Sequence, residues 1–290
     1  MPGVHATLSA SGADRWINCP PSARLEQEFP ETDSQYASEG TLAHRLCELL
    51  LRKHFTAMKP STYKKELSDI QADPQYSQAM MEHCTNYLNF VIECRNEIRN
   101  PIIAIEQRVD FSGYVPEGFG TCDCVIIGDG IMRIIDFKYG AGVPVSAENN
   151  PQLKLYAVGA YLGFSMIYDI DTIINTIFQP RIDSISASEI SADELVLWAD
   201  EIRPIAELAF EGEGEFKAGN HCRFCRAKAI CRARAEENLA AARYDFQKPE
   251  LLEDSEIGEI LCIADRLKGW IADITEHALI QAREIGRAHV

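Results

Sequence analysis

The stretch GTCDCVIIGDGIMRIIDFK, residues 120–138, decides the fold class of this protein. It holds two apolar runs rich in β-branched residues, and Gly128-Asp129-Gly130 between them is typical of a tight hairpin turn. PIIAIEQRVDF, residues 101–111, predicts a strand before this hairpin, and DTIINTIFQ, residues 171–179, predicts a buried strand after it. These runs together indicate a β-sheet in the middle of the chain.

Helical patterns surround these strands along the chain. Leucines recur at helical spacing over about 40–55, and a second helical pattern covers 75–100. We also expect helices over 148–163 and 191–210, and from Arg232 onward. Residues 56–74 are rich in lysine and marked by proline, so we expect them to connect the first two helices. The pattern predicts an α/β or α+β fold, with a mixed sheet flanked by helices and helical additions at both ends.

Composition limits the class of protein. The chain of 290 residues is 46% hydrophobic and 25% charged, which is typical of a globular protein and excludes disorder as its main state. No apolar run approaches the roughly 18 residues of a membrane span, and the first residues lack the pattern of a secretion signal. We therefore expect a cytoplasmic protein. A net charge of −16 opposes non-specific nucleic-acid binding, although a basic patch or a bound divalent metal overrides the average locally.

Two carboxylates, Asp123 and Asp136, lie on the two strands of the predicted hairpin, so we expect them to converge. Paired carboxylates offer the hard oxygen ligands that Mg²⁺ and Mn²⁺ prefer. Side chains alternate along a strand, so Lys138 shares a face with Asp136 and is placed to orient or help deprotonate a water. A divalent metal that activates a water is the standard arrangement for hydrolysis of a phosphodiester. An acid-x-Lys triplet alone is also common on a solvated strand face.

Other candidate residues lie on either side of this hairpin. Gln152 and Tyr156 are four residues apart on a predicted helix, so they share a face that could reach a nucleic-acid strand. His44 lies on an amphipathic predicted helix, where a histidine is more often structural than a metal ligand. Glu106, on the strand before the hairpin, could add a carboxylate, but we expect it at the surface.

The order of these motifs resembles that of a known family. They are Gly40-Thr-Leu-Ala-His44, Gly120-Thr-Cys-Asp123, Ile134-Ile-Asp136-Phe-Lys138 and Gln152-Leu-Lys-Leu-Tyr156. This order is similar to that of the RecB-type branch of the PD-(D/E)XK nuclease superfamily, over about residues 38–160. Each motif is weak alone, whereas their order and spacing together are fairly specific.

The resemblance implies a restriction-endonuclease-like fold and a role for each matching residue. His44, Asp123 and Asp136 would hold Mg²⁺ or Mn²⁺, and Lys138 would be the catalytic lysine. Gln152 and Tyr156 would contact DNA or brace the site. The sequence departs from the family where cysteines, Cys122 and Cys124, flank the first acid in place of apolar residues.

Three of the ten cysteines have the spacing of metal ligands: Cys222-x₂-Cys225-x₅-Cys231. In a protein expected in a reducing compartment, this spacing indicates a metal site rather than disulfides. A closed site needs a fourth ligand. His221 is adjacent, but we expect it to be badly placed because its backbone is committed to Cys222.

A second resemblance supplies a candidate fourth ligand. In the RecB-like subgroup of AddB and the four-cysteine CRISPR-associated nucleases, an N-terminal cysteine joins three C-terminal ones around a [4Fe–4S] cluster. Cys19, which is followed by proline, matches that position. The resemblance thus implies a structural cluster held by Cys19, Cys222, Cys225 and Cys231, which would tie the two ends of the chain together. Zinc is the alternative, because C-x₂-C is equally half of a zinc site.

Basic residues are concentrated around the C-terminal cysteines, namely Arg223, Arg226, Lys228, Arg232 and Arg234. We expect them to contact DNA phosphates, although they could simply offset the charge of the thiolates.

These observations predict a nuclease domain over residues 1–240, closed by the cluster, and a helical extension over 241–290. The extension is amphipathic over 255–284, and the residues from Glu284 on look foreign, so we expect a truncated chain. The expected function is that of a Mg²⁺- or Mn²⁺-dependent DNA nuclease, an exonuclease of phage or prophage recombination or repair, with a single-strand annealing protein as implied partner. Two alternatives stay open: a non-catalytic DNA-binding or assembly protein with an iron–sulfur or zinc clip, and a zinc-dependent regulator.

Overall fold

The computed structural model describes residues 6–30, 35–240 and 253–284. The expected foreign tail after Glu284 lies outside these residues. The chain divides into two compact units, one of Met1–Ala13 with Thr32–Glu207 and the other of Asp14–Glu31 with Leu208–Val290. The expected boundary at residue 240 stays a prediction, and α9 makes ion pairs, described below, with the segment that carries the last cysteines.

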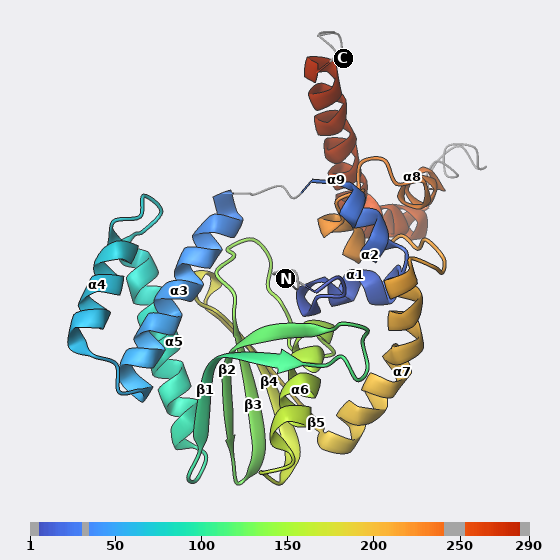
Figure 1. Ribbon diagram of the computed structural model, residues 1–290. Coiled ribbons are helices and arrows are strands. Elements are labelled where there is room, and N and C mark those ends of the chain that lie inside the picture. The colour runs from blue at the N-terminus through green and yellow to red at the C-terminus, as the bar shows by residue number, and fades with distance from the viewer. Residues whose placement is uncertain (1–5, 31–34, 241–252, 285–290) are drawn as a thin grey trace. The chain divides into compact units, whose positions relative to one another are not determined.

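A five-stranded mixed sheet forms the centre of the first unit (Figure 1). Its strands follow sequence order: β1 (Ile102–Asp110), β2 (Phe119–Gly128), β3 (Gly130–Phe137), β4 (Ile170–Gln179) and β5 (Ser184–Ser191). Neighbouring strands are antiparallel except β3 and β4, which are parallel. The predicted hairpin is confirmed, and its turn residues Asp129 and Gly130 have φ values of 53° and 78°, as a two-residue turn of this kind requires.

The parallel pair β3 and β4 is joined by α6 (Pro151–Phe164), as a parallel connection requires. The helix begins where the side chain of Asn150 accepts the Leu153 N–H at 3.2 Å, with proline in the first turn. It packs closely on the sheet: a Cβ built on Gly159 would lie 2.9 Å from Cβ of Val109. The start of α6 is therefore fixed close to the end of β3.

Three helices of the first unit, α3 (Gln35–Phe55), α4 (Pro60–Gln71) and α5 (Gln78–Asn96), precede the sheet in the chain. Leucines of α3 and the buried side chains of α5 form one core with Ile126, Ile135 and Phe137 of the hairpin. The α4 helix corrects our expectation of a connection over residues 56–74. Its lysines occupy the exposed face, while Tyr63, Leu67 and the buried Ile70 form a narrow apolar face.

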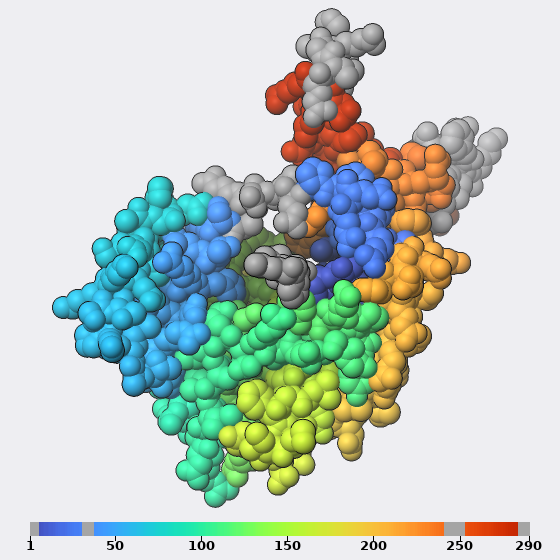
Figure 2. All heavy atoms as spheres, viewed as in Figure 1, coloured from blue at the N-terminus to red at the C-terminus, as the bar shows by residue number. Residues whose placement is uncertain are grey.

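The β1–β2 pair changes the face that it presents to the helices partway along its length. Ile105 and Cys124 belong to the core made with α3 and α5, whereas Val109 and Gly120 contact α6. Residues an even number of positions apart should share a face in a regular strand, so the pair bends between these positions. Figure 2 shows the end of β1 and the start of β2, in green, against α6, in yellow-green. The bend falls at Glu106, whose φ is 50°, and at Asp123 opposite it.

The second unit is helical among the residues that the structure describes. It contains most of α1 (Ala13–Asn18), α2 (Ser22–Leu25), the end of α7 (Ala192–Glu211), α8 (Arg232–Leu239) and α9 (Asp254–Glu284). Short 3₁₀ turns include Glu26–Glu28 and Asn220–Phe224. Within the described ranges, no helix is long and apolar enough to cross a membrane.

The predicted fold class is confirmed: a mixed sheet flanked by helices, with helical regions at both ends. The strand that the sequence pattern missed is β5, SISASEIS. Half of its residues are serines, and it is an edge strand whose side chains alternate between half-buried and exposed, so no apolar run marked it.

Candidate functional site

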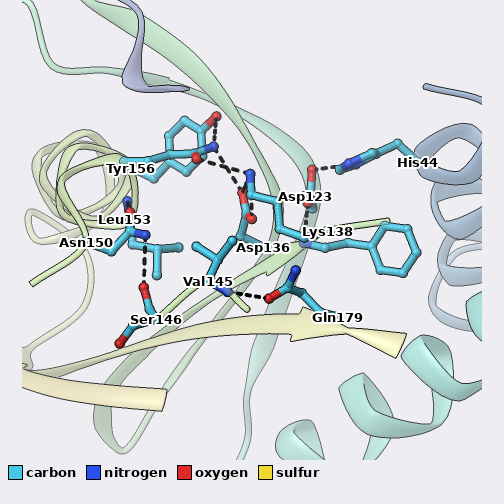
Figure 3. Close-up of polar contacts among 12 residues, drawn as sticks. His44, Asp123, Asp136, Lys138, Val145, Ser146, Asn150, Leu153, Tyr156 and Gln179 are labelled. Carbon is cyan, nitrogen blue, oxygen red and sulfur yellow. Dashed lines mark hydrogen bonds and ion pairs between the residues drawn. The ribbon is translucent and has the colours of Figure 1, made fainter. Parts of the chain in front are cut away.

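Two residues from separate elements, His44 on α3 and Asp123 on β2, lie side by side where the β1–β2 pair bends. His44 Nδ1 lies 3.1 Å from Asp123 Oδ1, and the other carboxylate oxygen accepts the Phe137 N–H at 2.7 Å. The ring of Phe137 packs edge-on against the imidazole, with centroids 5.3 Å apart. Both side chains are thus held in one orientation (Figure 3). The His44 side chain is still 34% exposed.

Glu106 joins this pair, contrary to our expectation of a surface position. One ligand atom from each of His44, Glu106 and Asp123 lies within 4.8 Å of the other two, and we call these residues the carboxylate–histidine group. Burial, followed by the charge of Asp123, raises the pKa of Glu106 to about 7. Strand periodicity missed Glu106 because it assumes a regular strand, whereas the bend at Glu106 turns its side chain inward.

A second cluster follows at the end of β3, where Asp136 is only 4% exposed. Lys138 Nζ lies 2.9 Å from Asp136 Oδ2 and donates to Oδ1 at 3.2 Å and to the Gln152 Oε1 at 3.1 Å. The Gln152 amide nitrogen donates to Asp136 Oδ1 and to the hydroxyl of Tyr156, both at 3.2 Å. Gln152 therefore braces the Asp136–Lys138 pair, which is one of the two roles that the family resemblance implied (Figure 3).

The glycine of the Gly120-Thr-Cys-Asp123 motif has a steric role in this cluster. A Cβ on Gly120 would lie 2.7 Å from the ring of Tyr156, which real Cβ contacts essentially never show. Only glycine leaves room for the tyrosine at this position. The motif thus places Asp123 beside His44 and also allows α6 to bring Tyr156 and Gln152 close to the sheet.

Burial and charge act in opposite directions on the ionisable groups. Burial raises the pKa of Asp136 above its usual value, and Lys138 only partly offsets this. Burial lowers the pKa of Lys138, but the adjacent Asp136 carboxylate outweighs it, so the pKa of this lysine is raised. For His44, burial lowers the pKa and Asp123 more than restores it. Lys138 is therefore an ammonium held between two oxygen acceptors.

The donor set of the carboxylate–histidine group fits a divalent cation. One imidazole nitrogen and two carboxylates suit Mn²⁺, and the carboxylates suit Mg²⁺. Asp136, the third ligand implied by the family resemblance, follows Ile135, which pairs with Cys124, so it lies opposite Asp123 in the hairpin. Its side chain bonds Lys138 and Gln152. The structure thus brings His44 and Asp123 together with Glu106, and places Asp136 beside them.

The second unit contains the other predicted site. Cys19, Cys222, Cys225 and Cys231 line one pocket, which we call the cysteine pocket. Cys19 and Cys222 are buried, and Cys225 and Cys231 are partly exposed. Four thiols that line one cavity are the donor type that a thiolate-bound cluster or metal needs. Cys19 therefore shares a pocket with the other three cysteines, although it lies 203 residues from Cys222 in the sequence.

His221 also lines the cysteine pocket, and that it is badly placed as a ligand stays a prediction. The imidazolium donates hydrogen bonds to the sulfur atoms of Cys19 and Cys222, and these bonds raise the His221 pKa to about 10. Its Nε2 lies 2.8 Å from the Lys217 carbonyl oxygen. The 3₁₀ turn of residues 220–224 directs the His221 and Cys222 side chains into the same pocket, which their adjacency in sequence did not suggest.

Three of the five basic residues expected to bind DNA make contacts within the second unit. Arg234 is buried, and its guanidinium lies 2.7 Å from Asp273 of α9, which Lys228 also contacts at 2.7 Å. The guanidinium of Arg226 donates to the backbone carbonyl of Glu26 at 3.4 Å. These contacts hold α9 and residues 26–29 to the cysteine segment. Of the expected set, Arg223, Arg226 and Arg232 are exposed. Arg223 and Arg232 are the better candidates for phosphate contacts, because Arg226 bonds Glu26.

The fold and the site define an α/β protein with a carboxylate–histidine group at the bend of its central sheet and a separate cysteine pocket. The family model described as "Protein of unknown function (DUF2800)" matches residues 5–289, and the chain belongs to this family. A solved structure, "Crystal structure of SSO0001", is similar at 18% identity over 74% of this chain and 95% of that chain, with a TM-score of 0.30. At that TM-score the likeness says nothing further about this chain.

Proposed function

We propose that this protein is a Mg²⁺- or Mn²⁺-dependent DNA nuclease of the RecB-like PD-(D/E)XK type. The observation that carries the proposal is the convergence of two clusters from five elements. His44, Glu106 and Asp123 come from α3, β1 and β2, and they lie beside the Asp136–Lys138 pair, which Gln152 of α6 braces. A core histidine in a structural role would not need two carboxylates and a buried acid–lysine pair around it.

The residues of the site have separate roles in this proposal. His44, Glu106 and Asp123 would hold the cation, with Asp136 beside it. When bound, the cation supplies a Lewis acid that lowers the pKa of water and stabilises charge on the phosphate. Lys138 is a hydrogen-bond donor to Asp136 and Gln152, so we assign it to orient the attacking water and to stabilise charge on the phosphate oxygens. The ring of Phe137 packs against His44, and the backbone N–H of Phe137 holds the Asp123 carboxylate.

The cysteine pocket supports a structural metal centre in the same proposal. We assign it a [4Fe–4S] cluster bound by Cys19, Cys222, Cys225 and Cys231, with zinc as the alternative. Because Cys19 precedes the sheet in sequence and the other three follow it, such a centre would link distant segments of the second unit. Stability would then depend on occupancy of this centre.

The physiological setting rests on the family resemblance. We propose an exonuclease of phage or prophage recombination or repair, acting on DNA in the cytoplasm with a single-strand annealing protein as its partner.

The test is to purify the full chain without oxygen and incubate it with labelled linear DNA, with Mn²⁺ or with EDTA. We expect cleavage that needs the metal and is lost in Asp136→Asn. Asp129→Asn is the matched control, because it makes the same change in the exposed turn of the same hairpin, where asparagine tolerates a φ of 53°. DNA binding without metal-dependent cleavage would instead support the non-catalytic DNA-binding alternative.

A further inference from the structure

The segment between Lys138 and Asn150 connects the two halves of the proposed active site. Lys138 directly follows β3, and its backbone N–H donates to the Phe178 carbonyl at 2.9 Å. Two residues after the segment, Gln152 bonds Lys138 and Asp136. Most of the segment is exposed, and residues 140–144 are exposed throughout. The first turn of α6, which carries Gln152, therefore begins at the end of this segment.

Gln179, the last residue of β4, holds the middle of the segment. Its side chain is 2% exposed, and both ends of its amide bond the segment's backbone. The Oε1 atom accepts the Val145 N–H at 2.6 Å, and Nε2 donates to the Val143 carbonyl oxygen at 3.2 Å. A buried amide whose two hydrogen bonds both go to one exposed loop is satisfied by that loop and would be costly to bury without it.

A chain of hydrogen bonds continues from this clamp to α6 (Figure 3). The side-chain amide of Asn150 donates to the Ser146 carbonyl oxygen at 3.0 Å, and its oxygen accepts the Leu153 N–H at 3.2 Å. Ser186 of β5 accepts the Ala147 N–H at 2.9 Å. Ser146, which follows Val145, is thus hydrogen-bonded to Asn150, the residue that caps α6. Gln179 fixes the loop, the loop fixes Asn150, and Asn150 fixes the first turn that carries Gln152.

We propose that Gln179 is a positioning residue that acts through this loop to hold Gln152 against Lys138 and Asp136. The inference rests on the proposed nuclease function, because it assigns Gln179 a role in that site. Gln179 makes no hydrogen bond to the carboxylate–histidine group, whose residues come from α3, β1 and β2. Loss of the clamp should therefore reduce the rate of the chemical step and leave metal binding unchanged.

The first test is kinetic and uses the full chain with Mn²⁺. Gln179→Met keeps the side-chain volume and removes both hydrogen bonds, and Gln179→Glu keeps only the acceptor. We expect kcat to fall about 10- to 100-fold in Gln179→Met and less in Gln179→Glu. The affinity for Mn²⁺, measured by electron paramagnetic resonance of the free ion, should stay within about 2-fold. Unchanged kcat in Gln179→Met would overturn the proposal, as would a matching loss of Mn²⁺ affinity.

A double-mutant cycle separates positioning from general stability. If Gln179 acts through Gln152, Gln179→Met should cause no further loss of kcat in a Gln152→Ala background, because coupled residues are not additive. Additive losses would show that Gln179 acts by another route. Thr176→Val is the matched control on the same strand, since the buried Thr176 hydroxyl has no hydrogen-bond partner among the described residues. We expect its kcat to match that of the wild type.

Hydrogen exchange distinguishes failure of this inference from failure of the nuclease proposal. In Gln179→Met we expect faster amide exchange at Val145 and at Leu153, in the first turn of α6. If the wild type cleaves no DNA, the proposed function fails, and faster exchange at both amides would still support the clamp. Unchanged exchange at Leu153 would overturn the clamp whatever the activity.

Discussion

Glu106 stands across from Asp123 at the point where the β1–β2 pair bends. Their neighbours are paired on both sides, Ile105 with Cys124 and Gln107 with Cys122, and Glu106 has a φ of 50°. A non-glycine residue in this region costs about 1–3 kcal/mol of strain and persists where the surrounding structure imposes it. Here the strain accompanies a useful geometry, because it brings two carboxylates and His44 within 4.8 Å.

Glu106→Gln should reveal the cost of this geometry in the metal-free protein. The pKa of Glu106 is raised from 4.5 to about 7 in the fold, so the folded state binds more protons than the unfolded state between these values. Stability of the wild type therefore falls as the pH rises through this window. After allowance for solvent screening, we expect Glu106→Gln to be more stable than the wild type by about 1–2 kcal/mol at pH 8 in EDTA, and no more stable below pH 4.5.

Addition of Mn²⁺ should stabilise Glu106→Gln less than the wild type. The wild type should gain more stability from the ion than Glu106→Gln, because the amide is a weaker ligand than the carboxylate. Urea unfolding with and without Mn²⁺ at both pH values measures these differences. Equal stabilisation of the two proteins by Mn²⁺ would show that Glu106 is not a ligand of the metal.

Lys138→Ala should abolish cleavage and preserve DNA binding. Lys138 is held by Asp136 and Gln152 at the end of β3, where it can act on the reacting phosphate but offers little area for general DNA contact. We expect cleavage to fall about 10³-fold, the scale of removing one donor that stabilises the transition state, with Kd for DNA changed less than about 3-fold. Lys65→Ala, on the exposed face of α4, is the control. Loss of DNA binding in Lys138→Ala would show that Lys138 contacts the DNA phosphates for binding and would contradict its catalytic role.

Gly120→Ala should disturb the site through Tyr156. The added methyl group would lie 2.7 Å from the tyrosine ring, so the ring, α6 or β2 must shift. We expect a loss of about 1–3 kcal/mol in unfolding free energy, typical of overpacking, together with reduced activity as Gln152 moves with the helix. Gly113→Ala is the control, since a Cβ there meets nothing within 4 Å. Wild-type stability and activity in Gly120→Ala would show that the close approach is not needed.

Cys19→Ser should remove the proposed cluster. Its thiol lines the same pocket as Cys222, Cys225 and Cys231, and serine is a poor ligand for iron. We expect loss of the broad absorption near 400 nm of the anaerobically purified protein and a lower Tm. Cys262→Ser is the control, because Cys262 is exposed on α9 outside this pocket. Full iron content in Cys19→Ser would exclude Cys19 as a ligand, and a colourless wild type containing zinc would favour the zinc alternative.

Local sequence signals were sufficient for much of this protein. The hairpin of residues 119–137 follows from two β-branched runs around a Gly-Asp-Gly turn, and α6 is the helix predicted over residues 148–163. Both depend on residues close in sequence, so the pattern reports them directly. The spacing of Asp136 and Lys138 along one strand likewise placed both side chains on one face.

The tertiary structure alone decided the contacts between distant segments. Glu106 lies in the site because the β1–β2 pair bends. Lys228 and Arg234, which we expected to contact DNA, form ion pairs with Asp273 of α9. Gln179 is an unremarkable strand residue until the loop at Val143 and Val145 folds over it. None of these partners is encoded by a local period, because a buried charge or amide is satisfied by whichever group the packing of the whole chain brings to it.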